Sequence, residues 1–144
     1  MKDPYKAGLF SSNPYHAKTD ISSKLCVVLD GKLENRELSL IKQISRCVLK
    51  HEIHELILSD EAGIGPGSTV NKIAYLGFTE IEQGGVLTAG DSVYCAGKFI
   101  GTLAGFDETH MPNHLNIVIS TSNRTSGAEQ GISLDSEIVF KHTK

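Results

Sequence analysis

The residues best suited to chemistry lie between positions 105 and 119, where a polar stretch runs directly into an apolar strand. The side chains in this segment that can bind metals, hold anions or move protons are Asp107, Glu108, Thr109, His110, Asn113, His114 and Asn116. Binding residues are often carried on loops that a rigid strand holds in place. The segment 105–119 is therefore the strongest candidate for a functional site in the sequence.

The first interpretation of this segment is a metal site. His110 and His114 are four residues apart, a spacing that brings two ligands together on a helix. Pro112 lies between them and disfavours a helix through both histidines, so a shared geometry must come from a turn. In such a turn Asp107 could join His110 and His114 to bind a divalent metal ion.

The second interpretation is a site for a small molecule or an anion. Side chains alternate along a strand, so His114 and Asn116 share one face and the apolar residues between them share the other. If the apolar residues fill the interior, His114 and Asn116 point outward beneath the loop. The residues predicted to bind the ligand are Asp107, Thr109, His110, Asn113, His114 and Asn116.

A purely structural interpretation stands beside these two. Asp107, Thr109 and Asn113 have side chains that readily bond their own backbone in an Asx-rich turn. His114 would then be a structural histidine with no ligand. The residue types alone leave the three interpretations open.

A second group of polar residues is His51-Glu52-Ile53-His54-Glu55. Its histidines are three residues apart, which departs from the HExxH pattern of zinc proteases. On a regular strand His51 and His54 face opposite ways and cannot chelate one ion. The sequence therefore favours a solvent-exposed strand edge for this group of residues. Arg46 and His54 could still join the first site from a neighbouring strand.

Composition bounds the class of protein. A chain of 144 residues fits one domain with a real hydrophobic core. The net charge of -3 argues against a nucleic-acid partner. No window approaches the roughly 20 apolar residues that span a bilayer, and the N-terminus lacks a signal-peptide pattern, so we expect a cytoplasmic protein with no membrane partner. The three widely spaced cysteines predict buried thiols in a reducing compartment.

Short runs rich in β-branched residues, separated by turn residues, predict an all-β fold. Strands are expected over 25–29, 46–50, 54–58, 72–82, 93–95, 99–103, 114–121 and 138–140. One helix is a candidate over 34–43. We predict an extended N-terminal arm over 1–22 and a single β-barrel domain over 23–144, small and closed or partly open, with at most one short helix. Such an arm could be shared between subunits of a homo-oligomer.

The C-terminal half contains motifs in a recognisable order: Gly85-Val86-Leu87-Thr88-Ala89-Gly90-Asp91, the hairpin, Gly105, His114-Leu115-Asn116-Ile117-Val118-Ile119 and the closing segment 132–140. In this order the region from about 72 to 141 resembles the sorbitol-specific IIA component of the sugar phosphotransferase system. The resemblance implies a small closed β-barrel. That family receives a phosphoryl group on a histidine in the strand before the Gly85-Val86 turn, and here the strand over 75–82 has no histidine.

The whole chain also resembles a bacterial family of uncharacterised proteins. The similarity is greatest at Tyr75-Leu76-Gly77-Phe78 and over residues 109–118. This second resemblance implies no activity.

Three functions follow from these observations. The first is a cytoplasmic module that binds a small metabolite or a partner protein, because no complete catalytic set is present. The second is a small metal-dependent enzyme, with Asp107, His110 and His114 as ligands. Its general base would be Glu108 or Glu80. The third is a component like those of the phosphotransferase system that lacks the usual phosphoacceptor histidine.

Overall fold

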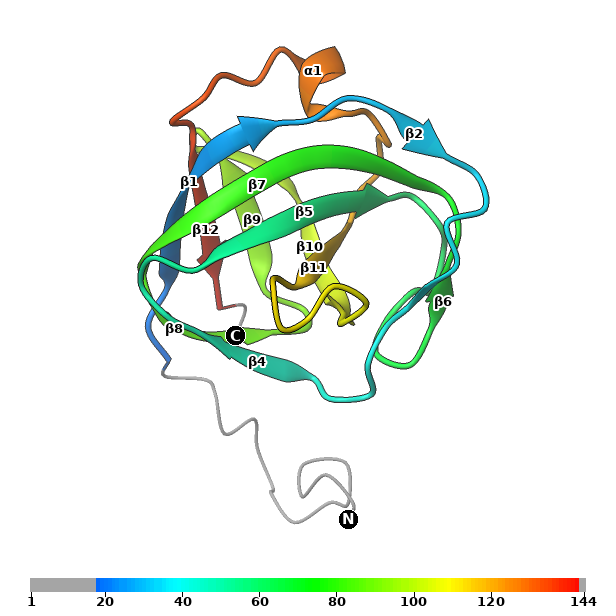
Figure 1. Ribbon diagram of the computed structural model, residues 1–144, viewed down its shortest axis with the longest axis horizontal. Helices are drawn as coiled ribbons and strands as arrows, with labels where there is room; N and C mark the ends of the chain where they lie inside the picture. Colours follow the sequence, from blue (N-terminus) through cyan, green and yellow to red (C-terminus); the bar gives the residue numbers. More distant parts are fainter. Residues whose placement is uncertain (1–17, 143–144) are drawn as a thin grey trace.

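The computed structural model describes residues 18–142, and its architecture is the mostly β fold predicted, with 52% strand and 3% helix. Seven strands form a closed ring (Figure 1). In ring order they are β1 (Ile21–Val28), β12 (Glu137–Lys141), β9 (Ser92–Cys95), β10 (Lys98–Asp107), β11 (Asn116–Ser120), β5 (Ile53–Ser59) and β7 (Ile73–Gln83). The ring closes because β7 pairs with β5 on one side and with β1 on the other. Neighbouring ring strands are antiparallel, except that β11 and β5 are parallel.

Shorter elements lie outside or across the ring. They are β2 (Lys32–Leu33), β3 (Leu38–Ser39), β4 (Ser45–Val48), β6 (Thr69–Val70), β8 (Gly85–Thr88) and α1 (Gly127–Gln130). β2 pairs with the beginning of β7, β3 pairs with β6, and β4 pairs with β8. In Figure 1 the β4–β8 pair crosses below the ring and α1 lies at the opposite end.

Two apolar clusters hold these elements together. The main cluster draws residues from every ring strand, and alternation along the strands places it inside the ring. Its members include Ile21, Leu56, Leu76, Val93, Leu103, Phe106, Leu115, Ile117, Ile119 and Phe140. The second cluster joins the outer face of the ring to the β3–β6 pair and consists of Leu38, Leu40, Ile57, Val70, Ile73, Ala104 and Val118. Part of the outer face is therefore covered.

The long strand β7 changes face along its length. The sequence predicts one face for Ile73, Tyr75, Thr79 and Ile81, and this prediction is wrong. Ile73 belongs to the outer cluster and Ile81 to the interior one. The reason is a shift of register near Gly77 in the pairing with both neighbouring strands. A bulge moves every later side chain to the opposite face.

The predicted helix over 34–43 is absent. Leu38 and Leu40 are buried while Ser39 between them is exposed, which is the period of an extended chain. Glu37 has a φ of 56°, outside the range of a right-handed helix. The short helix α1 lies instead between the strands expected over 114–121 and 138–140, where Ser126 and Glu129 form a capping box at its start.

Most predicted strands are present within a few residues of their expected bounds. β1 begins at Ile21, before the predicted end of the arm at 22, and residues 1–17 of that arm lie outside the described residues. β11 begins at Asn116, so His114 precedes the strand. The prediction of buried thiols holds for Cys95 only, because Cys26 and Cys47 are exposed.

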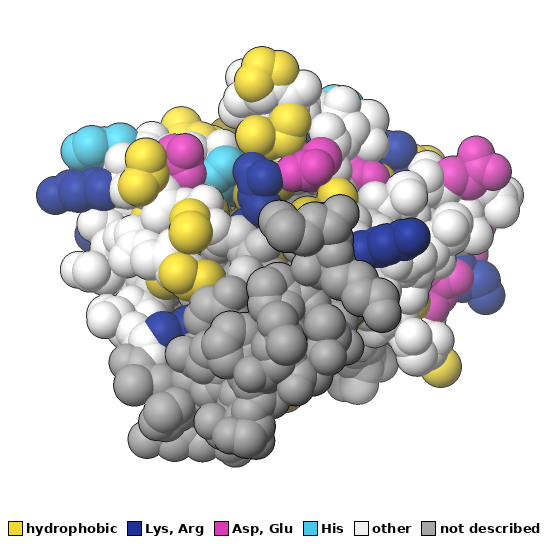
Figure 2. Space-filling model, turned by 90° about the horizontal axis from the view of Figure 1, so that it is seen from below, with side chains coloured by type: hydrophobic (Ala, Val, Ile, Leu, Met, Phe, Trp, Pro, Cys, Tyr) yellow, Lys and Arg dark blue, Asp and Glu magenta, His cyan; other side chains and the backbone are white. Residues whose placement is uncertain are grey.

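The surface view in Figure 2 shows basic and acidic side chains interspersed around one face of the molecule. None of the helices among residues 18–142 has the length and apolar character needed to cross a membrane. Because apolar side chains fill the interior of the ring, two places remain for polar chemistry. They are the outer face beside the second apolar cluster and the ends of the ring.

Gly77 lies where β7 pairs with β1 and closes the ring. A Cβ at this position would overlap the carbonyl oxygen of Val27 on β1. We expect Gly77→Ala to lower the free energy of unfolding by about 2 kcal/mol or more, because the two strands must separate to admit the methyl group. Gly65→Ala is the matched control, since nothing lies within 4 Å of its Cβ position. Urea denaturation of the two variants measures the difference, and equal effects would contradict the close approach.

Candidate functional site

Three polar side chains lie side by side on the outer face of the ring. Glu55 of β5 is paired with Asn116 of β11, and Asn116 is paired with Asp107 of β10. We call these three residues the polar row. Their exposed fractions are 7%, 1% and 1%. Buried polar groups are normally hydrogen-bonded, so each member must be accounted for by its partners.

Asp107 has a complete set of partners. Its Oδ1 accepts from the backbone N–H of Thr109 at 2.9 Å and from Nδ2 of Asn116 at 3.1 Å, and its Oδ2 accepts from the backbone N–H of Ser39 at 3.0 Å. Burial alone would raise the pKa of Asp107, but these hydrogen bonds outweigh it and hold the pKa below its usual value. The bond to Thr109 is the Asx turn of the structural interpretation. Asp107 is an ionised anchor for the loop.

His114 packs between two aromatic neighbours beside the polar row. Its ring centroid lies 5.0 Å from that of His110, with the planes tilted by 32°. The ring of Phe78 lies on another side of His114 in a T-shaped arrangement, with the ring centroids 5.1 Å apart. Nδ1 of His114 faces Nδ2 of Asn113 at 3.0 Å. The loop thus folds back so that His110 covers His114, while Asp107 does not.

Glu55 and His114 are close but imperfectly paired. Oε1 of Glu55 lies 3.4 Å from Nε2 of His114, within range of an ion pair but long for a hydrogen bond, and among residues 18–142 Nε2 has no other partner. Burial raises the pKa of Glu55, and the nearby His114, His110 and Arg36 offset only part of that effect. Oδ1 of Asn116 is likewise buried without a partner.

The predicted metal trio is not brought together. His110 and His114 stack on each other, whereas Asp107 lies beyond Asn116 in the polar row and is held by backbone N–H groups. Within residues 18–142 no group of three or more His, Cys, Asp or Glu side chains is placed to hold a metal ion. Of the other predicted site residues, Asn113 contacts His114, and Thr109 contributes its backbone to Asp107.

The sequence suggested that the second group of polar residues forms a solvated edge. This prediction fails at His54, which is buried. The backbone N–H of Leu115 donates to its Nδ1 at 3.0 Å, so Nε2 carries the proton and donates to Glu52 at 3.2 Å. His51 is exposed and pairs with Glu80 at 3.2 Å. His54 therefore ties the start of β5 to the residue just before β11.

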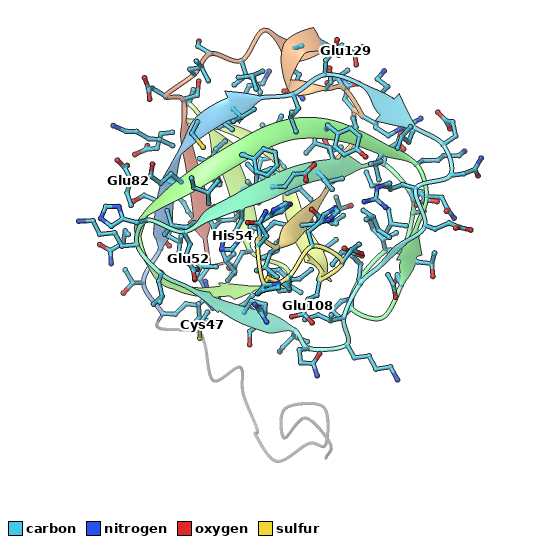
Figure 3. The ribbon with its side chains drawn as sticks, in the orientation of Figure 1. Cys47, Glu52, His54, Glu82, Glu108 and Glu129 are labelled. Atoms are coloured by element: carbon cyan, nitrogen blue, oxygen red, sulfur yellow. The ribbon has the colours of Figure 1, made fainter. Side chains whose placement is uncertain are left out.

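Arg46 also reaches the predicted site. Its guanidinium donates to Glu108 at 2.6 Å and so connects β4 to the loop over 108–114. Figure 3 shows Glu108 at the lower edge of the ring, with His54 and Glu52 beside the loop that leads into β11. Both Arg46 and His54 thus contact the segment 105–119, as the sequence allowed.

A separate cavity of about 610 Å³ lies near the other end of the parallel pair β5–β11. It is lined by Leu58, Cys95, Ala96, Lys98, Phe99, Ile100, Thr121, Ser122, Asn123, Thr125, Gln130, Gly131, Ile132, Ser133 and Ser136. Neither this cavity nor a smaller one of about 250 Å³ is lined by His114 or the polar row. The one signal for it in the sequence is the run of hydroxyl and amide side chains over 121–136.

Comparison with known proteins places the chain in a family. A family of unknown function, DUF6917, matches residues 15–141. The chain belongs to this family. No curated protein and no solved structure matches the chain. The DUF6917 match covers the whole ring and assigns no chemistry to it, and nothing in these comparisons supports the resemblance to the sorbitol-specific component.

The raised pKa of Glu55 gives a pH-dependent prediction for the DUF6917 chain. A carboxyl whose pKa is higher in the folded state than in the unfolded state costs stability once pH rises through the folded value. The gain in the free energy of unfolding of Glu55→Gln over wild type should therefore be larger at pH 7 than at pH 3.5. Urea denaturation in buffer containing a chelator measures this difference, with Glu137→Gln on the exposed part of β12 as control. A difference of the opposite sign would show that Glu55 is stabilised as a carboxylate.

Proposed function

We propose that the protein is a small-metabolite-binding module whose ligand occupies the 610 Å³ cavity. The cavity itself is the observation that carries the proposal. Sites for small molecules have volumes of roughly 300–1,000 Å³ and combine an apolar lining with a few polar groups. Mouths of closed β-structures are a common place for them.

The floor of the cavity is part of the hydrophobic core. Leu58 and Cys95 belong to the interior cluster, and Ile100 and Ile132 pack against it. A ligand would therefore rest an apolar portion on residues that are held rigidly by the ring. Rigid walls reduce the entropy lost on binding.

The walls of the cavity are polar and almost uncharged. Hydroxyl and amide groups come from Thr121, Ser122, Asn123, Thr125, Gln130, Ser133 and Ser136. Among the lining residues that the structure describes, Lys98 is the only charged one, and none carries a carboxylate. This chemistry favours a polar metabolite that is uncharged or carries a single negative charge, and it disfavours cations.

The wall next to α1 is held in place by its own hydrogen bonds. The side chain of Gln130 donates to the carbonyl of Thr125 at 2.9 Å, and Ser136 donates to the carbonyl of Ser133 at 2.7 Å. The capping box of Ser126 and Glu129 fixes the start of the helix. These contacts support a cavity that is formed before a ligand arrives.

A panel of polar metabolites, grouped as uncharged, singly anionic and cationic, tests the proposal by thermal unfolding. Binding at a concentration one hundredfold above Kd adds about 2.7 kcal/mol of stability, so a true ligand should raise Tm by several degrees. We expect hits among the uncharged or anionic compounds and none among the cationic ones. A panel that leaves Tm unchanged in every group would contradict the proposal.

Two variants locate any binding that is found. Ser122→Trp places an indole in the cavity at an exposed loop position, and it should abolish the shift in Tm. Ala62→Trp adds the same group at an exposed position outside the lining and should preserve the shift. If both variants lost the shift in Tm equally, the ligand would bind outside the cavity.

A further inference from the structure

We propose that Glu55, His114 and Asn116 form a binding site for a first-row divalent metal ion such as Zn²⁺. This site differs from the predicted trio in two of its three ligands, and it does not rest on the function proposed for the cavity. It lies at the opposite end of the parallel pair β5–β11 from that cavity.

The first support is a pair of buried atoms that lack partners. Nε2 of His114 and Oδ1 of Asn116 are both inaccessible to solvent, and neither has a hydrogen-bond partner of good geometry in the described part of the chain. Leaving a buried polar group unsatisfied costs about 1–3 kcal/mol, so such groups in a well-packed region point to a missing water, ion or ligand. An imidazole nitrogen is a preferred ligand of Zn²⁺, and an amide oxygen is a weaker donor to divalent cations.

The second support is the distance between His114 and Glu55. Their nearest atoms are 3.4 Å apart, which exceeds the usual length of an N–H···O hydrogen bond. Two atoms that each lie about 2.1 Å from a tetrahedral ion are about 3.4 Å apart. The separation therefore suits two ligands of one ion better than it suits a direct hydrogen bond.

The third support is the group that orients Asn116. Its Nδ2 donates to Asp107, and that bond directs Oδ1 away from Asp107. Glu55 is the residue paired with Asn116 on the other side, in the register of β5 and β11. Asp107 thus acts as the partner that positions a ligand, a role that outer carboxylates commonly play at metal sites.

The amide of Asn113 can serve His114 in the same way. It lies 3.0 Å from Nδ1 of His114. An amide presents either its nitrogen or its oxygen after a half-turn about its terminal bond, and with the oxygen toward Nδ1 it accepts the proton there. Nε2 is then free of a proton and able to bind a metal ion.

The surrounding charges limit which ion can bind. The positive charge of Arg36 acts on Glu55 and opposes a cation, and Glu55 is the only carboxylate among the three ligands. Mg²⁺ and Ca²⁺ need several oxygen ligands and would bind poorly. Ions with high affinity for imidazole nitrogen, such as Zn²⁺, Ni²⁺ and Cu²⁺, suit a site with one histidine, one carboxylate and one amide.

Calorimetric titration of the full chain with Zn²⁺ tests the site. The protein is freed of any affinity tag and treated with a chelator. It carries Cys26→Ser and Cys47→Ser because both cysteines are exposed and thiolates compete for zinc. We expect saturable binding of one ion and no binding of Mg²⁺ at the same concentration. Each of His114→Gln, Glu55→Gln and Asn116→Ala should weaken Zn²⁺ binding tenfold or more.

The exposed pair of His51 and Glu80 provides a matched control, because it also joins an imidazole to a carboxylate, at 3.2 Å. His51→Gln should leave the affinity unchanged. A second readout needs no variant, since Zn²⁺ should shift the ring NMR signals of His114 and leave those of His51 in place. Absence of saturable binding, or binding that His51→Gln abolishes and His114→Gln does not, would overturn the proposal.

Discussion

The pairing of β7 with both β1 and β5 determines where every other element of the fold lies. It turns an open sheet into a ring, and the interior then fills with side chains of the main apolar cluster. Gly77 permits this closure because its missing Cβ leaves room for the carbonyl of Val27. A filled interior has no space for polar chemistry, so functional groups must lie on the outer face or at the ends of the ring.

The outer face is where the polar row is assembled. The parallel pairing of β5 with β11 brings Glu55 beside Asn116, and the pairing of β11 with β10 adds Asp107. The loop between β10 and β11 is anchored where it leaves β10, through Asp107, and where it enters β11, through the bond from Leu115 to His54. These anchors fix His114 over Glu55 without giving its Nε2 a hydrogen-bond partner. The site is therefore rigid and incompletely satisfied, a combination that costs stability unless something binds there.

The sequence predicted the features that depend on local patterns. Alternation of polar and apolar residues placed His114 and Asn116 outside and Leu115 and Ile117 inside, and both interior residues lie in the main cluster. It could not predict Glu55 as a neighbour of His114, because that contact depends on a parallel pairing between segments about 60 positions apart. The helix expected over 34–43 is absent for a similar reason. Leu38 and Leu40 have an extended backbone because they pair with the distant residues Val70 and Asp107.

We propose that the outer face of the ring, beside His114, binds an ion that completes its unsatisfied groups. Anomalous X-ray diffraction at the zinc edge, on crystals of the full chain grown with Zn²⁺, tests this proposal. We expect an anomalous peak within bonding distance of Nε2 of His114 and a carboxylate oxygen of Glu55, with Oδ1 of Asn116 as the third ligand. A bridging water at that position, with zinc bound only elsewhere, would contradict it.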